Sequence, residues 1–292
     1  MKNKIKQFHD KHYKTLLLIP LLILLFSFVY LGFFYKTNND FIYKDISLTG
    51  GTSVTLYEEI NVQDLQNELS SKLEDLNTRE IYDVVTQERK AIVIETKSDG
   101  DYTKDLIEKF IGHELNDENS SFEFTGSSLS ESSYKQLLVA ILVAFIFMGI
   151  VVFIMFRSFV PSAAVILSAF ADILMTLTLV NLLGIKMSSA GIVAFLMLIG
   201  YSVDTDILLT TRVLKRNEGS LNERIYNSFK TGTTMTLTSL LAITFALIVV
   251  KSFSLILAQI FTILVIGLVF DIFNTWITNV SILKWYMLRK KQ

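Results

Sequence analysis

Residues 200–212 read Gly-Tyr-Ser-Val-Asp-Thr-Asp-Ile-Leu-Leu-Thr-Thr-Arg and directly continue the wholly apolar run 191–199. Length and hydrophobicity predict one membrane-spanning helix over both segments. Asp204 and Asp206 then lie where hydrocarbon is expected. An ionised side chain there costs about 2.5–3.5 kcal/mol on insertion scales unless it is neutralised, paired or hydrated. We therefore expect this helix to use its acids or to pair them.

The composition is that of an integral membrane protein. The 292 residues are 51% apolar, the mean hydropathy is +0.46, and several apolar runs are long enough to span a bilayer. The absence of cysteine excludes disulfides and cysteine-ligated metals, and no glycine-rich phosphate loop is present. The three histidines lie outside the apolar runs, at His9, His12 and His113. We expect no enzyme activity, cofactor, metal or nucleic-acid partner, and energy for work would have to come from an ion gradient or a partner.

The apolar runs predict six membrane spans. These are residues 16–35, 137–156, 162–183, 189–209, 233–250 and 255–283. The first run follows a lysine-rich leader but has no small-residue cleavage site, so we expect an uncleaved first span. The last run is too long for one straight span, and it is expected either to tilt or to end near Thr278 and continue along the surface as residues 279–287.

The distribution of Lys and Arg predicts the orientation. With a cytoplasmic amino terminus, the cytoplasmic segments hold 15 Lys and Arg residues, and the short outer loops hold only Lys186 and Lys251. The positive-inside rule then places both termini in the cytoplasm of a multi-pass protein of the cell membrane. We expect three parts: residues 1–35 as leader and first span, 36–133 outside the membrane, and 134–292 as a five-helix block.

Residues 36–133 have the pattern of a small α+β domain. Strands are expected at 52–57, 81–87, 91–96 and 121–125, and amphipathic helices at 61–76 and 101–115. The order β-α-β-β-α-β is that of a ferredoxin-like domain. Gly50 and Gly51 indicate a tight backbone position, residues 126–133 a flexible exit, and Asn119 a glycosylation candidate.

Several polar residues inside the spans are candidates for chemistry. Asp204 and Asp206 lie about 200° apart around a helix, so they cannot share one face. The other candidates are Asp172 with Thr176 one turn on, Asp271, Arg212 as an anchor or a partner for a carboxylate, and the threonines Thr231, Thr233, Thr234, Thr236 and Thr238. Their simpler interpretation is helix bridging or packing, as for Gly191, Gly200 and Gly267.

A carboxylate pair could also activate water in an intramembrane protease. Proteases of that kind resemble a Gly-x-Gly-Asp pattern, whereas the residues before Asp204 are Gly200-Tyr201-Ser202-Val203. The second glycine is absent, which disfavours this interpretation.

Four segments together resemble the SecF family, membrane subunits of the SecD–SecF protein-export complex. The fourth-helix segment 199–212, with Gly200, Tyr201 and Ser202, carries the most specific likeness. The others are 48–52 with its Gly50-Gly51 pair, 171–174 around Asp172, and the Thr-rich segment 231–241. The bacterial family pattern places an acid at the position of Thr205, whereas here acids stand on either side, a form similar to the archaeal branch.

The resemblance implies half of an RND-type transporter that works with a SecD partner and the Sec channel on secreted or membrane-protein substrates. It also implies use of the proton or sodium gradient, for which the candidate residues are Asp204, Asp206, Asp172, Asp271, Arg212 and Thr234. A stand-alone small RND-like permease and a purely structural membrane scaffold are the alternatives.

Overall fold

The structure is a computed structural model that describes residues 13–83, 86–215, 219–252 and 254–290. The leader 1–12, two positions of the strand expected at 81–87, part of the basic loop at 216–218 and the last two residues lie outside the described residues. Six helices are long and apolar enough to cross a membrane, which confirms the expected number. They comprise Tyr13–Asn38, Leu129–Phe156, Phe159–Leu182, Ser189–Lys215, Leu221–Val250 and Leu255–Lys290.

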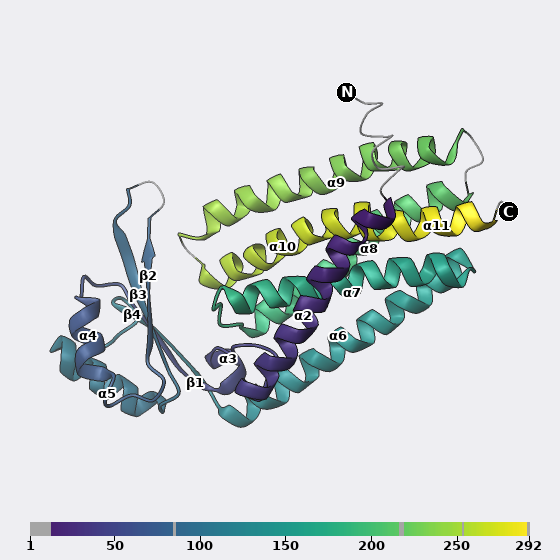
Figure 1. The fold of residues 1–292 in the computed structure, drawn as a ribbon. Helices are drawn as coiled ribbons and strands as arrows, with labels where there is room; N and C mark the ends of the chain where they lie inside the picture. The colour runs from purple at the N-terminus through teal and green to yellow at the C-terminus, as the bar shows by residue number, and fades with distance from the viewer. Residues whose placement is uncertain (1–12, 84–85, 216–218, 253, 291–292) are drawn as a thin grey trace.

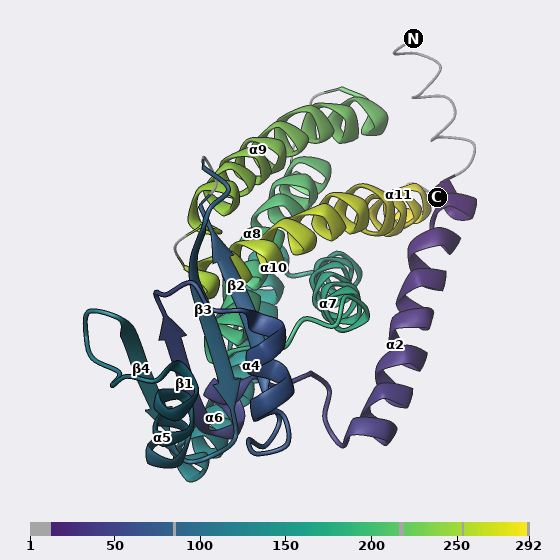
Figure 2. The same ribbon diagram turned by 90° about the vertical axis from the view of Figure 1, so that its left-hand side faces the viewer.

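The helix block is built around two adjacent helices, α7 (Phe159–Leu182) and α8 (Ser189–Lys215). The periphery is formed by α2 (Leu18–Asn38), α6 (Ser127–Phe156) and α9 (Leu221–Val250). In both α7 and α8, 56% of the most apolar stretch is buried, because α8 packs against α6, α7, α9, α10 (Leu255–Phe273) and α11 (Val280–Lys290), and α7 packs against α2, α6, α8, α10 and α11. Figure 2 shows α2 beside α7, away from the other peripheral helices.

The last span is one long helix with an irregular centre. It consists of α10 (Leu255–Phe273), the π-helical segment η1 (Asn274–Asn279) and α11 (Val280–Lys290). Val280 and Leu283 of α11 are buried against the block. The expected surface helix over 279–287 is therefore wrong, since the apolar residues of this stretch pack against neighbouring helices.

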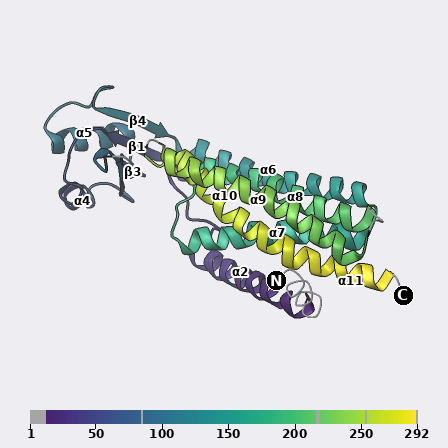
Figure 3. The same ribbon diagram turned by 90° about the horizontal axis from the view of Figure 1, so that it is seen from above.

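A four-stranded antiparallel sheet lies at one end of the helix block (Figures 1 and 3). The strand order is β2-β3-β1-β4, with α4 between β1 and β2 and α5 between β3 and β4. The elements are β1 (Gly51–Leu56), α4 (Val62–Leu69), β2 (Asn77–Tyr82), β3 (Arg89–Thr96), α5 (Gly100–Ile111) and β4 (Ser120–Thr125). Both the element order and the sheet order are those of the expected ferredoxin-like fold.

The core of the sheet domain lies between one sheet face and the two helices. Val54 and Ile94 of the sheet pack with Leu65 of α4 and Ile107 of α5, and all four side chains are fully buried. Asn61 caps α4 as its side chain accepts from the amide of Gln63, 3.0 Å away. The second strand begins and ends earlier than the expected 81–87, because its register is set by pairing with β3 rather than by its own alternation.

The opposite sheet face is turned toward the nearest end of the helix block. A cavity of about 560 Å³ lies between them. Its sheet wall includes Ser53, Thr55 and Glu95, and its helix wall includes Ser188 and Gln259. This face is therefore polar and uncovered by helices of its own domain.

The sheet is joined to the membrane block without a flexible linker. Helix α6 begins at Ser127, directly after β4, so the expected flexible exit at 126–133 is wrong. A Cβ on Gly50 would lie 2.4 Å from Cα of Ser127, and one on Gly51 would lie 2.3 Å from the carbonyl oxygen of Thr96. Both glycines have positive φ, at 82° and 143°, so the expected tight position is confirmed.

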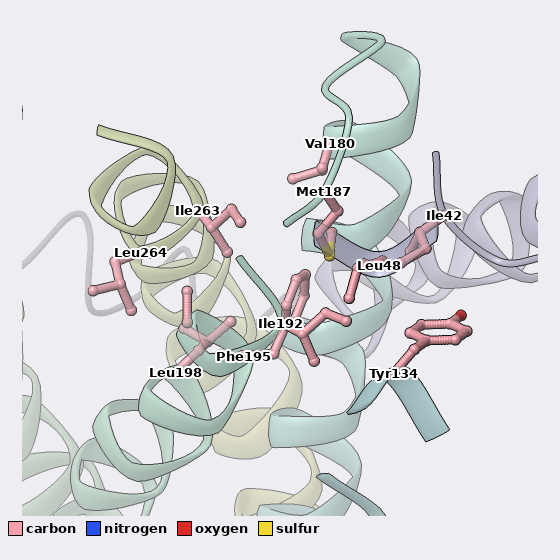
Figure 4. Close-up of a cluster of buried hydrophobic side chains, with 11 residues drawn as sticks. Ile42, Leu48, Tyr134, Val180, Met187, Ile192, Phe195, Leu198, Ile263 and Leu264 are labelled. Atoms are coloured by element: carbon pink, nitrogen blue, oxygen red, sulfur yellow. The ribbon is translucent and has the colours of Figure 1, made fainter. Parts of the chain in front are cut away.

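Residues 40–49, including the short helix α3 (Ile46–Thr49), pack onto the helix block rather than onto the sheet. The amide of Asp45 donates to the carbonyl of Met187 at 3.0 Å, and the amide of Met187 donates to that of Tyr43 at 2.6 Å. Ile42 and Leu48 join a buried apolar cluster of the transmembrane helices (Figure 4). The segment is thus physically part of the membrane block.

Two of the three glycines expected at helix contacts have that role. A Cβ on Gly191 would lie 2.7 Å from Oε1 of Gln259, and one on Gly267 would lie 2.5 Å from Leu198. Gly200 has nothing within 4 Å of that position and lies on an exposed face of α8, so it makes no such contact within this chain.

We predict that residues 51–125 fold when expressed alone, because their core closes without the membrane helices. Circular dichroism should show mixed helix and strand, and amide exchange should show protection along β1 and β3. The matched variant Leu65→Asp places a charge in the core, which costs several kcal/mol, and should abolish both signals. A wild-type fragment that exchanges as fast as this variant would refute an independent domain.

Candidate functional site

Three carboxylates are buried together in the centre of the helix block. Asp172 comes from α7, Asp206 from α8 and Asp271 from α10, and each side chain is 0% exposed. They lie close enough to act on one another electrostatically. The packing of α7, α8 and the α10–η1 segment therefore brings together acids from positions 172, 206 and 271 of the chain.

Asp172 is fully hydrogen-bonded. Its Oδ2 accepts from the hydroxyl of Ser202 at 2.6 Å, and its Oδ1 accepts from Nδ2 of Asn274 at 2.7 Å. The donors come from α8 and from η1, so this carboxylate joins three elements. Such bonds are the way in which a buried ionised group is made tolerable.

The other two carboxylates are only half satisfied. Oδ1 of Asp206 accepts from Nδ2 of Asn279 at 2.7 Å, and Oδ1 of Asp271 accepts from the hydroxyl of Thr275 at 3.2 Å. The second oxygen of each is buried and accepts no hydrogen bond within bonding distance from the described residues, although the hydroxyl of Ser168 lies near the carboxylate of Asp206. A buried polar atom without a partner costs about 1–3 kcal/mol, so these two atoms require an explanation.

The π-helical segment supplies the amide donors. In a π-helix the backbone hydrogen bonds run from residue i to i+5, so residues five apart lie one turn apart. Asn274 and Asn279 have this spacing, and they donate to Asp172 and Asp206 respectively. An α-helical path would rotate the second asparagine away from the first. π-helical turns are frequently found at functional sites.

The acids have no cationic partner. Within the part of the chain that the structure describes, no Lys, Arg or His forms an ion pair with Asp172, Asp206 or Asp271. Likewise, no group of acidic residues and histidines with metal-binding geometry occurs among those residues. A proton or a small cation bound at this cluster would offset the cost of the buried charge.

The two acids of the fourth-helix segment point in different directions, as their spacing predicts. Asp206 faces the cluster, whereas Asp204 lies on an exposed face of α8 together with Gly200 and Tyr201, which is 40% exposed. Ser202 of the same segment is buried and bonds to Asp172.

Arg212 and Thr234 lie apart from the carboxylates. One guanidinium nitrogen of Arg212 donates to the carbonyl of Asn227 and to the hydroxyl of Thr231, both at 2.9 Å, and so ties α8 to α9. Thr234 is exposed and donates to the carbonyl of Lys230 in its own helix. Gly50 and Gly51 lie at the junction of sheet and membrane block, far along the chain from the cluster.

Asn274, Thr275 and Asn279 were not predicted from the sequence as hydrogen-bond donors to the acids. Their signal was present: residues 274–279 read Asn-Thr-Trp-Ile-Thr-Asn, a polar interruption of an apolar run. Polar residues inside a span are pointers to a functional site. The five-residue spacing only becomes meaningful once the π turn is known.

Comparisons with known proteins agree with this architecture. The family described as "Protein export membrane protein SecD/SecF, C-terminal" matches residues 106–289. The protein-export membrane protein SecF of Methanocaldococcus jannaschii is 43% identical over 283 residues, 95% of this chain and 96% of that protein. SecF of Methanothermobacter thermautotrophicus is 38% identical over 281 residues, 95% of this chain and 93% of that protein.

A solved structure has the same fold. The crystal structure of SecDF, a translocon-associated membrane protein from Thermus thermophilus, matches 95% of this chain with a TM-score of 0.73 at 20% identity. This chain spans only 38% of the SecDF chain, whereas it spans nearly the whole of the archaeal SecF proteins. On the strength of its sequence and its six-helix fold, the chain belongs to the SecF family of protein-export membrane proteins.

Proposed function

We propose that this SecF protein promotes protein export across the cell membrane together with a SecD partner and the Sec channel, and that Asp206, with Asp172 and Asp271, carries the coupling cation. The observation that supports the proposal is the cluster of three buried carboxylates without a cationic side chain. A group that only bridges helices needs one hydrogen bond, and Asp172 fits that role. Asp206 and Asp271 keep unused acceptor oxygens, and those are where a proton or sodium ion would bind.

The sequence alone did not distinguish Asp204 from Asp206 as the acid that binds the coupling cation. The burial of Asp206 supports its choice over the exposed Asp204. An exposed carboxylate on a membrane helix is costly in lipid, so Asp204 calls for a covering partner. Gly200 lets a second helix approach closely, because no atom lies within 4 Å of its Cβ position. The α8 face formed by Gly200, Tyr201 and Asp204 is therefore the proposed contact with SecD, through a helix that offers a cation or a hydrogen-bond donor.

The proposed orientation places the sheet domain outside the cell and both termini in the cytoplasm. Arg157 follows α6, and Arg212 and Lys215 end α8; these junctions and the end of α11 lie at the end of the block opposite the sheet (Figures 1 and 3). The positive-inside rule assigns that end to the cytoplasm. Residues 51–125 are the proposed outer domain, with 40–49 as part of the membrane block, in place of the boundary at 36.

We expect Asp206→Asn to abolish the stimulation of export by the ion gradient, because an amide cannot bind and release a cation in the same way. The assay is gradient-dependent export in vesicles that contain SecD, this protein and the Sec channel, with complex assembly measured alongside. Thr234→Val is the control and should export normally, since that hydroxyl bonds only within its helix. A scaffold role predicts the opposite pattern, in which Asp206→Asn weakens assembly and leaves ion dependence intact.

We expect a photo-crosslinker at Tyr201 to capture SecD in native membranes, because this side chain lies on the proposed contact face. The matched position is Val29, which is 65% exposed and belongs to α2, the helix that packs on α7. Asp204→Asn should reduce the yield at Tyr201. Capture of SecD at Val29 instead would place the partner elsewhere, and a protein that never captures SecD would support a stand-alone permease.

The absence of cysteine allows a direct test of orientation. Lys109→Cys in α5 and Lys290→Cys at the end of α11 both replace exposed lysines. A membrane-impermeant maleimide should label Cys at 109 in intact cells and Cys at 290 only after lysis. The reverse pattern would overturn the proposed topology.

A further inference from the structure

The pair formed by Asp206 and Asn279 has an unusual hydrogen-bond balance. The amide nitrogen of Asn279 donates to Oδ1 of Asp206 at 2.7 Å. The remaining oxygen on each side, Oδ2 of Asp206 and Oδ1 of Asn279, is buried and accepts no hydrogen bond within bonding distance from the described residues, although the hydroxyls of Ser168 and Thr275 lie near the Asp206 carboxylate. Both side chains are 0% exposed. Two unsatisfied acceptors thus belong to two residues that already bond to each other.

The neighbouring pair of Asp172 and Asn274 provides an internal comparison. Both oxygens of Asp172 accept hydrogen bonds, and Oδ1 of Asn274 accepts from the hydroxyl of Thr278 at 3.2 Å. This pair is satisfied with an ionised carboxylate. The asparagines of the two pairs lie one π turn apart, and the pairs have the same residue types. The pairs differ in their hydrogen bonds, because only the Asp206–Asn279 pair has oxygens that accept none.

The Asp206–Asn279 pair lacks a hydrogen-bond donor between its two remaining oxygens. An ionised carboxylate and an amide oxygen are both acceptors only, whereas a protonated carboxyl group has one O–H donor. One proton on Oδ2 of Asp206 could therefore serve two oxygens at once, as the acid O–H donates to the amide oxygen while the amide N–H donates to the acid carbonyl.

We propose that Asn279 is the positioning residue for the coupling proton, which Asp206 holds on Oδ2 in a closed acid–amide pair with Asn279. The proposal rests on the proposed function and deepens it, since it names the proton as the ion at this acid. Loading forms an O–H bond between Oδ2 and a proton delivered by water, and unloading returns that proton to water. The described conformation is the loaded one.

The π turn is the structural basis of this pair. Asn274 is fixed by Asp172 and Thr278, and the i+5 repeat carries Asn279 to the same side of the helix, opposite Asp206. The titratable groups nearest to Asp206 on the other elements are Asp172 of α7 and Asp271 of α10. No Lys, Arg or His within the described ranges forms an ion pair with Asp172, Asp206 or Asp271.

The test is infrared difference spectroscopy of the complex with SecD in lipid, recorded over a range of pH. A carboxylic acid C=O band that disappears in Asp206→Asn is assigned to Asp206. Asn279→Leu removes the N–H donor to that carbonyl, and the band should move to higher wavenumber. The matched variant Asn274→Leu removes the same group one π turn away and should leave this band in place.

A swapped pair tests the same idea with the same atoms. The double variant Asp206→Asn with Asn279→Asp keeps one acid and one amide, and we expect it to regain gradient-dependent export that Asp206→Asn alone has lost. This double variant also tests the acid–amide pair if Asn279→Leu does not assemble with SecD.

The outcomes separate the two proposals. A C=O band of Asp206 that is absent at every pH, or that is unmoved in Asn279→Leu, overturns the acid–amide pair while the role of Asp206 in export stands. A swapped variant as inactive as Asp206→Asn also counts against the pair. Full gradient-dependent export by Asp206→Asn overturns the proposed function itself.

Discussion

The membrane block depends on one constraint: a carboxylate removed from water must find its hydrogen-bond donors on neighbouring helices, because hydrocarbon provides none. Asp172 meets this constraint with Ser202 and Asn274, and in doing so joins α7, α8 and η1. The close approach at Gly267, where Leu198 fills the place of a side chain, brings α10 near enough for these bonds. Close helix packing at a small residue and the hydrogen bonds of a buried acid therefore occur together in this block.

Hydropathy and periodicity predicted the six spans and the order of the sheet domain because both are local properties of the chain. What local patterns cannot supply is the rotation of a helix about its axis. The spacing of Asp204 and Asp206 separates their directions but does not say which one faces the interior. The π turn at 274–279 changes the helical phase, and the extension of α6 back to Ser127 depends on contacts with Gly50 far along the chain.

Several helices of the block leave most of their apolar surface uncovered within this chain. Only 6% of the most apolar stretch of α6 and 11% of that of α9 are buried, and α8 leaves Asp204 uncovered. A SecDF chain more than twice as long contains the same fold over 38% of its length. The unburied faces and the uncovered acid of this SecF protein are the surfaces that the proposed SecD partner would cover.

The continuity of β4 with α6 has a mechanical consequence. The 30 residues of α6 make a rod about 45 Å long, and its first turn touches the backbone of Gly50 without an intervening hinge. A tilt of about 10° at the far end of such a rod displaces the near end by about 8 Å, given the helical rise per residue. The sheet domain follows this helix directly, so a small tilt of α6 in the helix block would displace the whole sheet domain.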